Sequence, residues 1–273
     1  MGSGLIIIIV VAGGFGALIG SFLNVIIYRL PRGESVVSPP SACPTCTHRI
    51  RGIDNIPVLS WILLRGKCRN CRSPIALRYP LVESGTALLF ASVAAWATSV
   101  LAVIPPTNTS GPALIPHALF VVAFLYLASV SVALALIDLD THTLPDKVVL
   151  PAYAVGALLL GAAALFSADF GRLLTASLGL AALWLLYFLM AVLYPGGMGF
   201  GDVKLAGVLG LFLGWLGWGP LVVGAFSAFL LGGVFALGLL ISRRVSRKGG
   251  IPFGPWMLAG AWVGIFAGDT IWK

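Results

Sequence analysis

The stretch GLIIIIVVAGGFGALIGSFLNVIIY (residues 4–28) runs without a single charged residue. An apolar helix of this length crosses a hydrocarbon core of about 30 Å. It is longer than the apolar region of a secretory signal peptide, and no basic segment precedes it. We therefore expect residues 4–28 to form a retained transmembrane helix.

Similar apolar runs recur along the rest of the chain. Of its 273 residues, 59% are hydrophobic and only 10% are charged, with a mean hydropathy of +1.03. This composition excludes an ordinary soluble domain and predicts an all-α polytopic membrane protein with about eight transmembrane helices. The predicted spans are 4–28, 81–104, 116–137, 148–168, 173–194, 203–217, 220–241 and 251–272.

The basic residues indicate how these spans are oriented. The net charge is +8. All Lys and Arg residues except Arg172 and Lys273 fall in four connections, counting Lys204 with the third: 29–80, 138–147, 195–202 and 242–250. Lys and Arg concentrate on the cytoplasmic side of membrane proteins, so we expect these loops inside and both termini outside. The charge thus marks topology beside membrane lipids and does not indicate a nucleic-acid partner.

The segment 29–80 is the only sizeable polar part of the chain. It contains all four cysteines, in CPTC (Cys43, Cys46) and CRNC (Cys68, Cys71). A segment of about fifty residues needs a staple to fold. Two CxxC pairs at this spacing are typical of a closed tetrahedral Cys₄ zinc site, which suits structure rather than catalysis.

Two alternatives to zinc are a pair of disulfides and a redox-active CxxC. The nine basic residues of 29–80 place the segment in the cytoplasm, where disulfides are rare. Neighbouring cations would also keep the thiols ionised as ligands. We therefore expect a structural zinc ion, with His48 as a surface residue and not a ligand.

Acidic residues gather where two predicted spans meet the cytoplasm. IDLDTHTLPD (137–146) ends the third span, and GMGFGDVKLAG (197–207) begins the sixth. Asp146 follows Pro145 at the start of an apolar run, a good position for a helix N-cap. Asp138 lies at a helix C-terminus, where the helix dipole disfavours a carboxylate, so its presence needs another reason.

Asp138 and Asp202 are predicted at the same membrane depth. Two carboxylates in a partly dry site cannot easily both ionise, so the pair would work as acid and base on one water molecule. This is the chemistry of aspartic proteases, and glycines before Asp202 would let a substrate backbone approach. Proton-coupled transport and simple helix capping remain open alternatives at this point.

Five blocks together resemble the bacterial type IV prepilin peptidase family, aspartic leader peptidases of the GxGD class. They are the two aspartate motifs, GSFLNVIIYRLPRGES (20–35), CPTCTHRIRGIDNIPVLSWILLRGKCRNCRSPIALRYPLVE (43–83) and IPFGPWMLAGAW (251–262). The resemblance implies that the catalytic pair is Asp138 and Asp202. It also implies that five neighbours support the two motifs: Pro145, Asp146, Gly199, Gly201 and Lys204.

The resemblance further implies an activity and a location. Members of the family cut the short basic leader from prepilins and pseudopilins of type IV pili and type II secretion, at the cytoplasmic face of the bacterial inner membrane. Many then methylate the new amino terminus with S-adenosylmethionine, and we expect both activities here. Cleavage without methyl transfer is the alternative, and the residues that would bind the methyl donor cannot be named.

The expected domain organisation follows the polar insert. Residues 1–28 form the first transmembrane helix, 29–80 the cytoplasmic Cys₄ insert, and 81–273 a seven-helix membrane peptidase domain.

Overall fold

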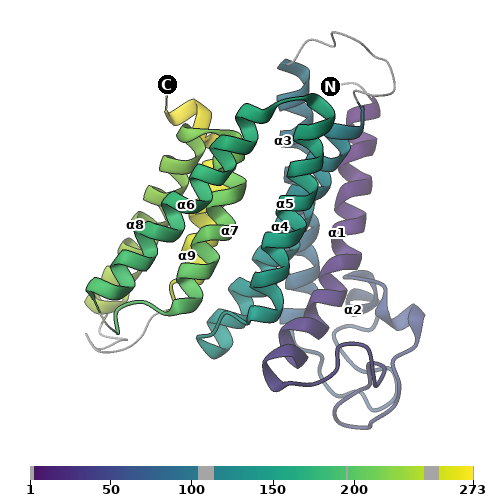
Figure 1. The fold of residues 1–273 in the computed structure, drawn as a ribbon. Coiled ribbons are helices and arrows are strands. Elements are labelled where there is room, and N and C mark those ends of the chain that lie inside the picture. Colours follow the sequence, from purple (N-terminus) through teal and green to yellow (C-terminus); the bar gives the residue numbers. More distant parts are fainter. Residues whose placement is uncertain (1–2, 104–113, 195, 243–251, 273) are drawn as a thin grey trace. The chain divides into compact units, whose positions relative to one another are not determined.

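The computed structural model describes residues 3–103, 114–194, 196–242 and 252–272, and within them it is helical without named strands. The predicted all-α class is confirmed. The helices are α1 (Ser3–Arg29), η1 (Leu30–Arg32), η2 (Gly52–Asn55), α2 (Leu59–Leu63), α3 (Arg78–Val103), α4 (Leu114–Thr141), α5 (Asp146–Ser167), α6 (Phe170–Leu193), α7 (Phe200–Leu216), α8 (Trp218–Ile241) and α9 (Gly254–Ile271) (Figure 1).

Within the described ranges, six helices are long and apolar enough to cross a membrane: α1, α3, α4, α5, α6 and α8. They lie at six of the predicted spans, and the chain is a multi-pass membrane protein. The predicted spans 203–217 and 251–272 correspond to α7 and α9, which have 17 and 18 residues and are not among the six. Eight spans therefore stays a prediction. The basic loop 242–250 lies, apart from its first residue, outside the described residues.

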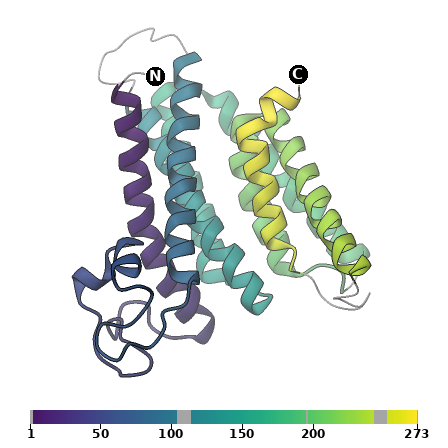
Figure 2. The same cartoon turned by 180° about the vertical axis from the view of Figure 1, so that it is seen from behind.

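The chain separates into two compact units, Met1–Pro105 and Pro106–Lys273. In the first unit, α1 and α3 pack along each other, as both ribbon views show (Figures 1 and 2). Gly20 allows this approach, since a Cβ there would lie 2.8 Å from the Cα of Glu83. Asn24 Nδ2 donates to the carbonyl of Tyr79 at 3.3 Å and joins the two helices near their polar ends.

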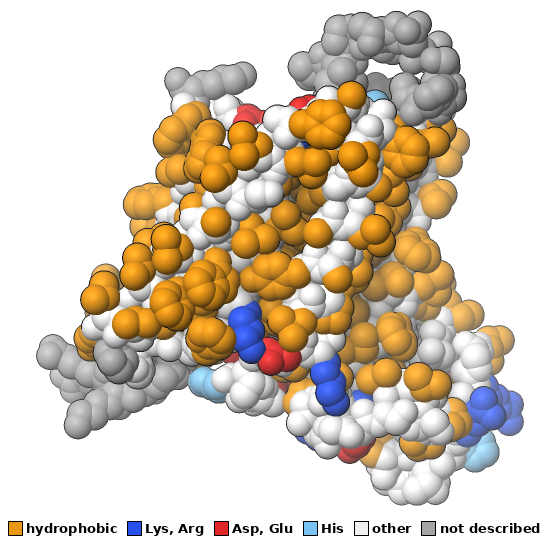
Figure 3. Space-filling model, viewed as in Figure 1, with side chains coloured by type: hydrophobic (Ala, Val, Ile, Leu, Met, Phe, Trp, Pro, Cys, Tyr) orange, Lys and Arg blue, Asp and Glu red, His pale blue; other side chains and the backbone are white. Residues whose placement is uncertain are grey.

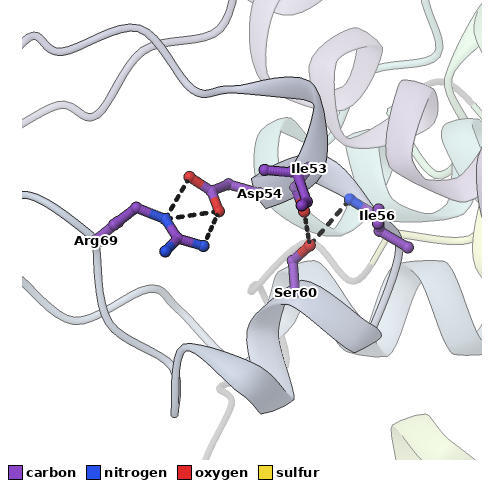
Figure 4. Close-up of polar contacts among 5 residues, drawn as sticks. All are labelled: Ile53, Asp54, Ile56, Ser60 and Arg69. Atoms are coloured by element: carbon purple, nitrogen blue, oxygen red, sulfur yellow. Dashed lines mark hydrogen bonds and ion pairs between the residues drawn. The ribbon is translucent and has the colours of Figure 1, made fainter.

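The polar insert of the first unit is held by short-range polar contacts. Ser60 Oγ donates to the carbonyl of Ile53 and accepts from the N–H of Ile56, so one hydroxyl connects η2 to α2 (Figure 4). The Arg69 guanidinium makes a fork with Asp54, at 2.6–3.0 Å, and this ion pair lowers the pKa of the Asp54 carboxyl. The segment between the cysteine pairs is thereby tied to the second pair.

The second unit contains α4 to α9. Helix α7 is buried along most of its length, from Val203 to Trp215, and packs against α5, α6, α8 and α9. Lipid gives helices no hydrophobic reason to associate, so small residues that permit close packing decide such contacts. Gly179 of α6 lies against Gly214 of α7, where a Cβ would come within 2.8 Å of the facing Cα.

Hydrophobic side chains cover the helices on the face drawn in Figure 3, while the charged side chains on that face gather near helix ends. Leu158, Leu174 and Phe226, for example, are more than 60% exposed within the protein alone. Such exposure is the distribution expected of a surface that faces lipid.

The contact between α8 and α9 gives a test of this packing. A Cβ at Gly260 would overlap the backbone of Ala228, with its Cα 2.6 Å away, whereas a Cβ at Gly233 of α8 meets nothing within 4 Å. We expect Gly260→Leu to destabilise the protein by about 2–3 kcal/mol through overpacking, seen as a lower thermal unfolding midpoint in detergent. Gly233→Leu is the matched control and should unfold like the wild type. Equal losses in both variants would contradict the packing.

Candidate active site and metal centre

Asp138 is a buried carboxylate near the end of α4, with 4% of its surface exposed. Its Oδ2 accepts a hydrogen bond of 3.1 Å from the N–H of Gly254, the first residue of α9. A Cβ at position 254 would stand 2.7 Å from the same oxygen. Glycine at 254 therefore lets a backbone N–H face the carboxylate, and the uncapped N-terminus of α9 stabilises its negative charge.

Asp202 is half-buried in the first turn of α7. Its Oδ2 accepts from the N–H of Gly199 at 3.2 Å, and its own N–H donates to the carbonyl of Gly199 at 3.0 Å. This reciprocal pair caps the helix. The cap uses Oδ2, so Asp202 both caps α7 and keeps a second carboxylate oxygen for other contacts.

The two aspartates face one site. Leu144, in the connection after α4, packs between their neighbours: a Cβ at Gly201 would lie 3.1 Å from Leu144 Cβ, and one at Gly254 would lie 3.2 Å from its Cδ2. The expected pair is thus brought together within one compact unit.

An aromatic cluster lies beside the start of α9. Tyr187 of α6 is 2% exposed. Its ring packs against Phe229 and Phe253, with centroids 5.5 and 6.3 Å away. The sequence patterns did not single out Tyr187, Leu144 or Gly254, although Leu144 lies within IDLDTHTLPD (137–146) and Gly254 within IPFGPWMLAGAW (251–262).

Lys204 and Asp146 form an ion pair that joins α7 to the start of α5. Lys204 Nζ lies 2.8 Å from both carboxylate oxygens of Asp146. The expectation that Asp146 is an N-cap is wrong, because α5 has Pro145 at that position and no side-chain cap. The Tyr153 hydroxyl donates to the backbone carbonyl of Lys204, which gives α7 a second tie to α5.

Asp140 differs from Asp138 in burial. It is exposed two residues further along α4, whereas Asp138 points into the unit. Within the described chain, Asp138 and Glu83 are the buried acids.

The four cysteines of the insert converge. Their Sγ atoms all lie within 4.8 Å of one another. Each pair lies in the same kind of turn. The N–H of Thr47 donates to the backbone carbonyl of Cys43 at 2.8 Å, and the N–H of Arg72 donates to the backbone carbonyl of Cys68 at 3.1 Å. Two matched turns that present four free thiols fit a tetrahedral thiolate-binding metal.

Hydrogen bonds favour ionisation of two of the four thiols. The N–H of Cys46 and, next, the Ser73 hydroxyl lower the pKa of the Cys43 thiol to about 5. The Ser73 hydroxyl and backbone likewise lower the pKa of Cys71. The hydrogen bond from the His48 backbone lowers the pKa of Cys46, but burial and the neighbouring thiols outweigh it and raise this pKa to about 11. Thiolates are the form that binds metal. His48 contributes its backbone carbonyl to the first turn and is not part of the ligand cluster.

Comparison with known proteins matches both compact units. Residues 15–97 match the model of the bacterial peptidase A24 N-terminal domain, and residues 125–237 match that of the type IV leader peptidase family. The first match includes the cysteine cluster and the second includes both aspartates.

Curated relatives match nearly the whole chain. Prepilin leader peptidase/N-methyltransferase from Aeromonas hydrophila is 37% identical over 94% of this chain and 90% of its own length. Proteins of the same name from Pseudomonas aeruginosa and Neisseria gonorrhoeae are each 34% identical, over 94% and 96% of this chain and 89% and 91% of their own lengths. No solved structure matches. The identity and the coverage together establish that this membrane protein belongs to the type IV leader peptidase family.

Proposed function

We propose that this enzyme cuts the basic leader from type IV prepilins or pseudopilins and then N-methylates the new amino terminus with S-adenosylmethionine. The observation that supports the proposal is that Leu144 adjoins both Gly254, whose N–H binds Asp138, and Gly201, which precedes Asp202, in a chain of this family. The names of its relatives combine the two activities.

The aspartate pair supplies the chemistry of the cleavage. Two nearby carboxylates share one proton, because like charges at short range cannot both ionise easily. The ionised member takes a proton from a water molecule that attacks the scissile carbonyl. The protonated member hydrogen-bonds to the carbonyl oxygen. The proton taken from water is then passed to the departing nitrogen, which leaves as an amine when its bond to the carbonyl carbon breaks. The Gly254 N–H holds Asp138 in place for this role.

The proposed location is the bacterial inner membrane, with the active site facing the cytoplasm. Asp138 lies in the last turn of α4 and Asp202 in the first turn of α7, and Leu144 lies near both ends, which supports one membrane boundary for the two residues. Basic residues gather in the loops on that side, as the positive-inside rule requires of a cytoplasmic face. The basic leader of the substrate would remain in the cytoplasm while its apolar helix stays in lipid.

The cysteine cluster would hold a structural zinc ion through Cys43, Cys46, Cys68 and Cys71. Bound zinc would supply folding free energy to an insert with few buried apolar residues. The described residues do not single out a pocket for S-adenosylmethionine. We therefore assign methyl transfer only broadly, to the insert 29–80 and the helix ends next to it. The proposed division remains 1–28, 29–80 and 81–273.

The function is tested by incubating the full chain in detergent with S-adenosylmethionine and a prepilin-like peptide, followed by mass spectrometry. The wild type should release the leader and add one methyl group to the remaining amine. Asp138→Asn and Asp202→Asn should each lower cleavage at least about a thousandfold, since the pair acts as a unit. Asparagine keeps an oxygen for the N–H groups of Gly254 and Gly199, so both variants should stay folded.

Asp140→Asn is the matched control for these variants, because it changes an exposed acid on the same helix. It should cleave at the wild-type rate. Full activity in Asp138→Asn, or loss of activity in Asp140→Asn alone, would discard the proposed pair.

The ion pair between Lys204 and Asp146 should position α7 more than it stabilises the protein. Asp146 is 53% exposed, and such pairs contribute only about 0–1 kcal/mol to stability. Small misplacements of a catalytic group nevertheless cost up to about a hundredfold in rate. We expect Lys204→Met and Asp146→Asn each to slow cleavage about tenfold, with the double variant no slower than either. Independent effects that multiply in the double variant would contradict a shared positioning role.

The metal site predicts about one zinc ion per chain in protein purified under reducing, chelator-free conditions. Cys46→Ser leaves three thiolates and should lose most of the zinc, measured by elemental analysis. Wild-type protein without zinc, or a Cys46→Ser variant with full zinc content, would contradict the four-thiolate site.

A further inference from the structure

Glu83 is a buried acid that the proposed peptidase chemistry does not use. It lies in the second turn of α3, with 8% of its surface exposed. It belongs to the first compact unit, whereas Asp138 and Asp202 belong to the second. A buried carboxylate is costly unless hydrogen bonds or a cation compensate it.

One oxygen of Glu83 has a structural partner in the insert. Its Oε2 accepts a 2.7 Å hydrogen bond from the N–H of Val58. Val58 is the centre of a γ-turn, with φ +61° and ψ −49°, and the N–H of Leu59 reaches back to the carbonyl of Pro57 at 2.6 Å. This conformation strains a β-branched residue by about 1–3 kcal/mol, so the Glu83 contact helps to hold it.

The other oxygen of Glu83, Oε1, has no such partner. The described contacts give it no hydrogen bond, and the Trp215 indole nitrogen is the one described side-chain atom that is fully buried and unpaired. Oε1 therefore reaches the surface. Among the nine basic residues of 29–80, Arg69 pairs with Asp54. Oε1 of Glu83 is therefore placed to accept a hydrogen bond from a ligand.

We propose that Oε1 of Glu83 binds the primary ammonium group that leader cleavage creates at the start of the pilin helix. This inference rests on the proposed function. Cleavage turns an amide nitrogen into a cation attached to an apolar helix, so the cation must stay at the membrane boundary. Glu83 lies one turn inside α3, which begins at Arg78, and the proposed topology puts that end of α3 on the cytoplasmic side.

The same contact holds the group that methylation uses. An α-amino group has a pKa of about 7.7–8.0, so near neutral pH most of it is the ammonium cation that a carboxylate oxygen can bind. Binding at Oε1 keeps this nitrogen in place, and the fraction that releases its proton to water is the nucleophile that methyl transfer requires.

The test is a binding measurement without any methyl donor. The probe is a labelled synthetic peptide with the sequence of a mature pilin-like amino terminus, in a free-amine and an N-acetylated form, added to the full chain in detergent. The wild type should bind the free amine about thirtyfold more tightly, or better, since acetylation removes one partner of a desolvated charge pair. Glu83→Gln should bind both peptides alike. Glutamine still offers an oxygen to Val58, so zinc content and leader cleavage should stay within about twofold of wild type.

Glu34→Gln is the matched control, because it makes the same change at an exposed acid of the insert. It should keep the preference for the free amine. Carbodiimide treatment of the unmutated chain gives a readout that does not depend on a variant's folding: the free-amine peptide should become joined to Glu83 by an amide bond, with the activated carbodiimide leaving as a urea, and the acetylated peptide should not.

Equal binding of the two peptides by the wild type, or an undiminished preference in Glu83→Gln, would overturn the inference. So would the absence of an amide cross-link between Glu83 and the free-amine peptide. Leader cleavage measured on the same preparations separates the two proposals: intact cleavage without amine discrimination removes only the role of Glu83, whereas an uncut prepilin removes the proposed function.

Discussion

The hydrogen bond from the N–H of Gly254 to Asp138 is the contact on which the candidate site depends. It joins residues 116 positions apart and lets a carboxylate remain buried near the end of α4, where the dipole of its own helix opposes it. The N-terminus of α9 supplies the opposing positive end. A side chain at 254 would fill the space between them, so the geometry requires glycine there. Leu144 adjoins both Gly254 and Gly201, and so connects the surroundings of Asp138 to those of Asp202.

The packed helices of the second unit hold Asp138 and Asp202 in position. Helix α7 carries Asp202 in its first turn and is buried from Val203 to Trp215, so it can shift little without disturbing its neighbours. Small residues at the α6–α7 and α8–α9 contacts bring the helix backbones close, as association within lipid requires. Functional groups carried on packed helices are held more accurately than groups on loops. The tie between Lys204 and Asp146 adds polar restraint at the end of α7 that faces water.

Much of this arrangement was predictable from the sequence, because apolar length and charge distribution are local signals. They predicted the six helices that are long enough to cross a membrane, and the CxxC spacing predicted the convergence of four thiols. The common membrane depth of Asp138 and Asp202 stays a prediction. The contacts that finish each site were not predictable, since they join distant residues: Gly254 with Asp138, Lys204 with Asp146 across 58 positions, and Val58 with Glu83 across 25. Asp146 illustrates this limit. Its local sequence predicted a helix cap, but its carboxylate pairs with the distant Lys204.

The most direct test of the central claim, that Asp138 and Asp202 share one proton and act together on water, is the pH dependence of leader cleavage. A pair that needs one ionised and one protonated member predicts a rate that passes through a maximum and falls at both lower and higher pH. The fall at high pH reports the loss of the shared proton, and the fall at low pH reports protonation of the base. A cleavage rate that rises to a plateau and stays there as the pH increases would contradict the shared proton and leave a single carboxylate as the working group.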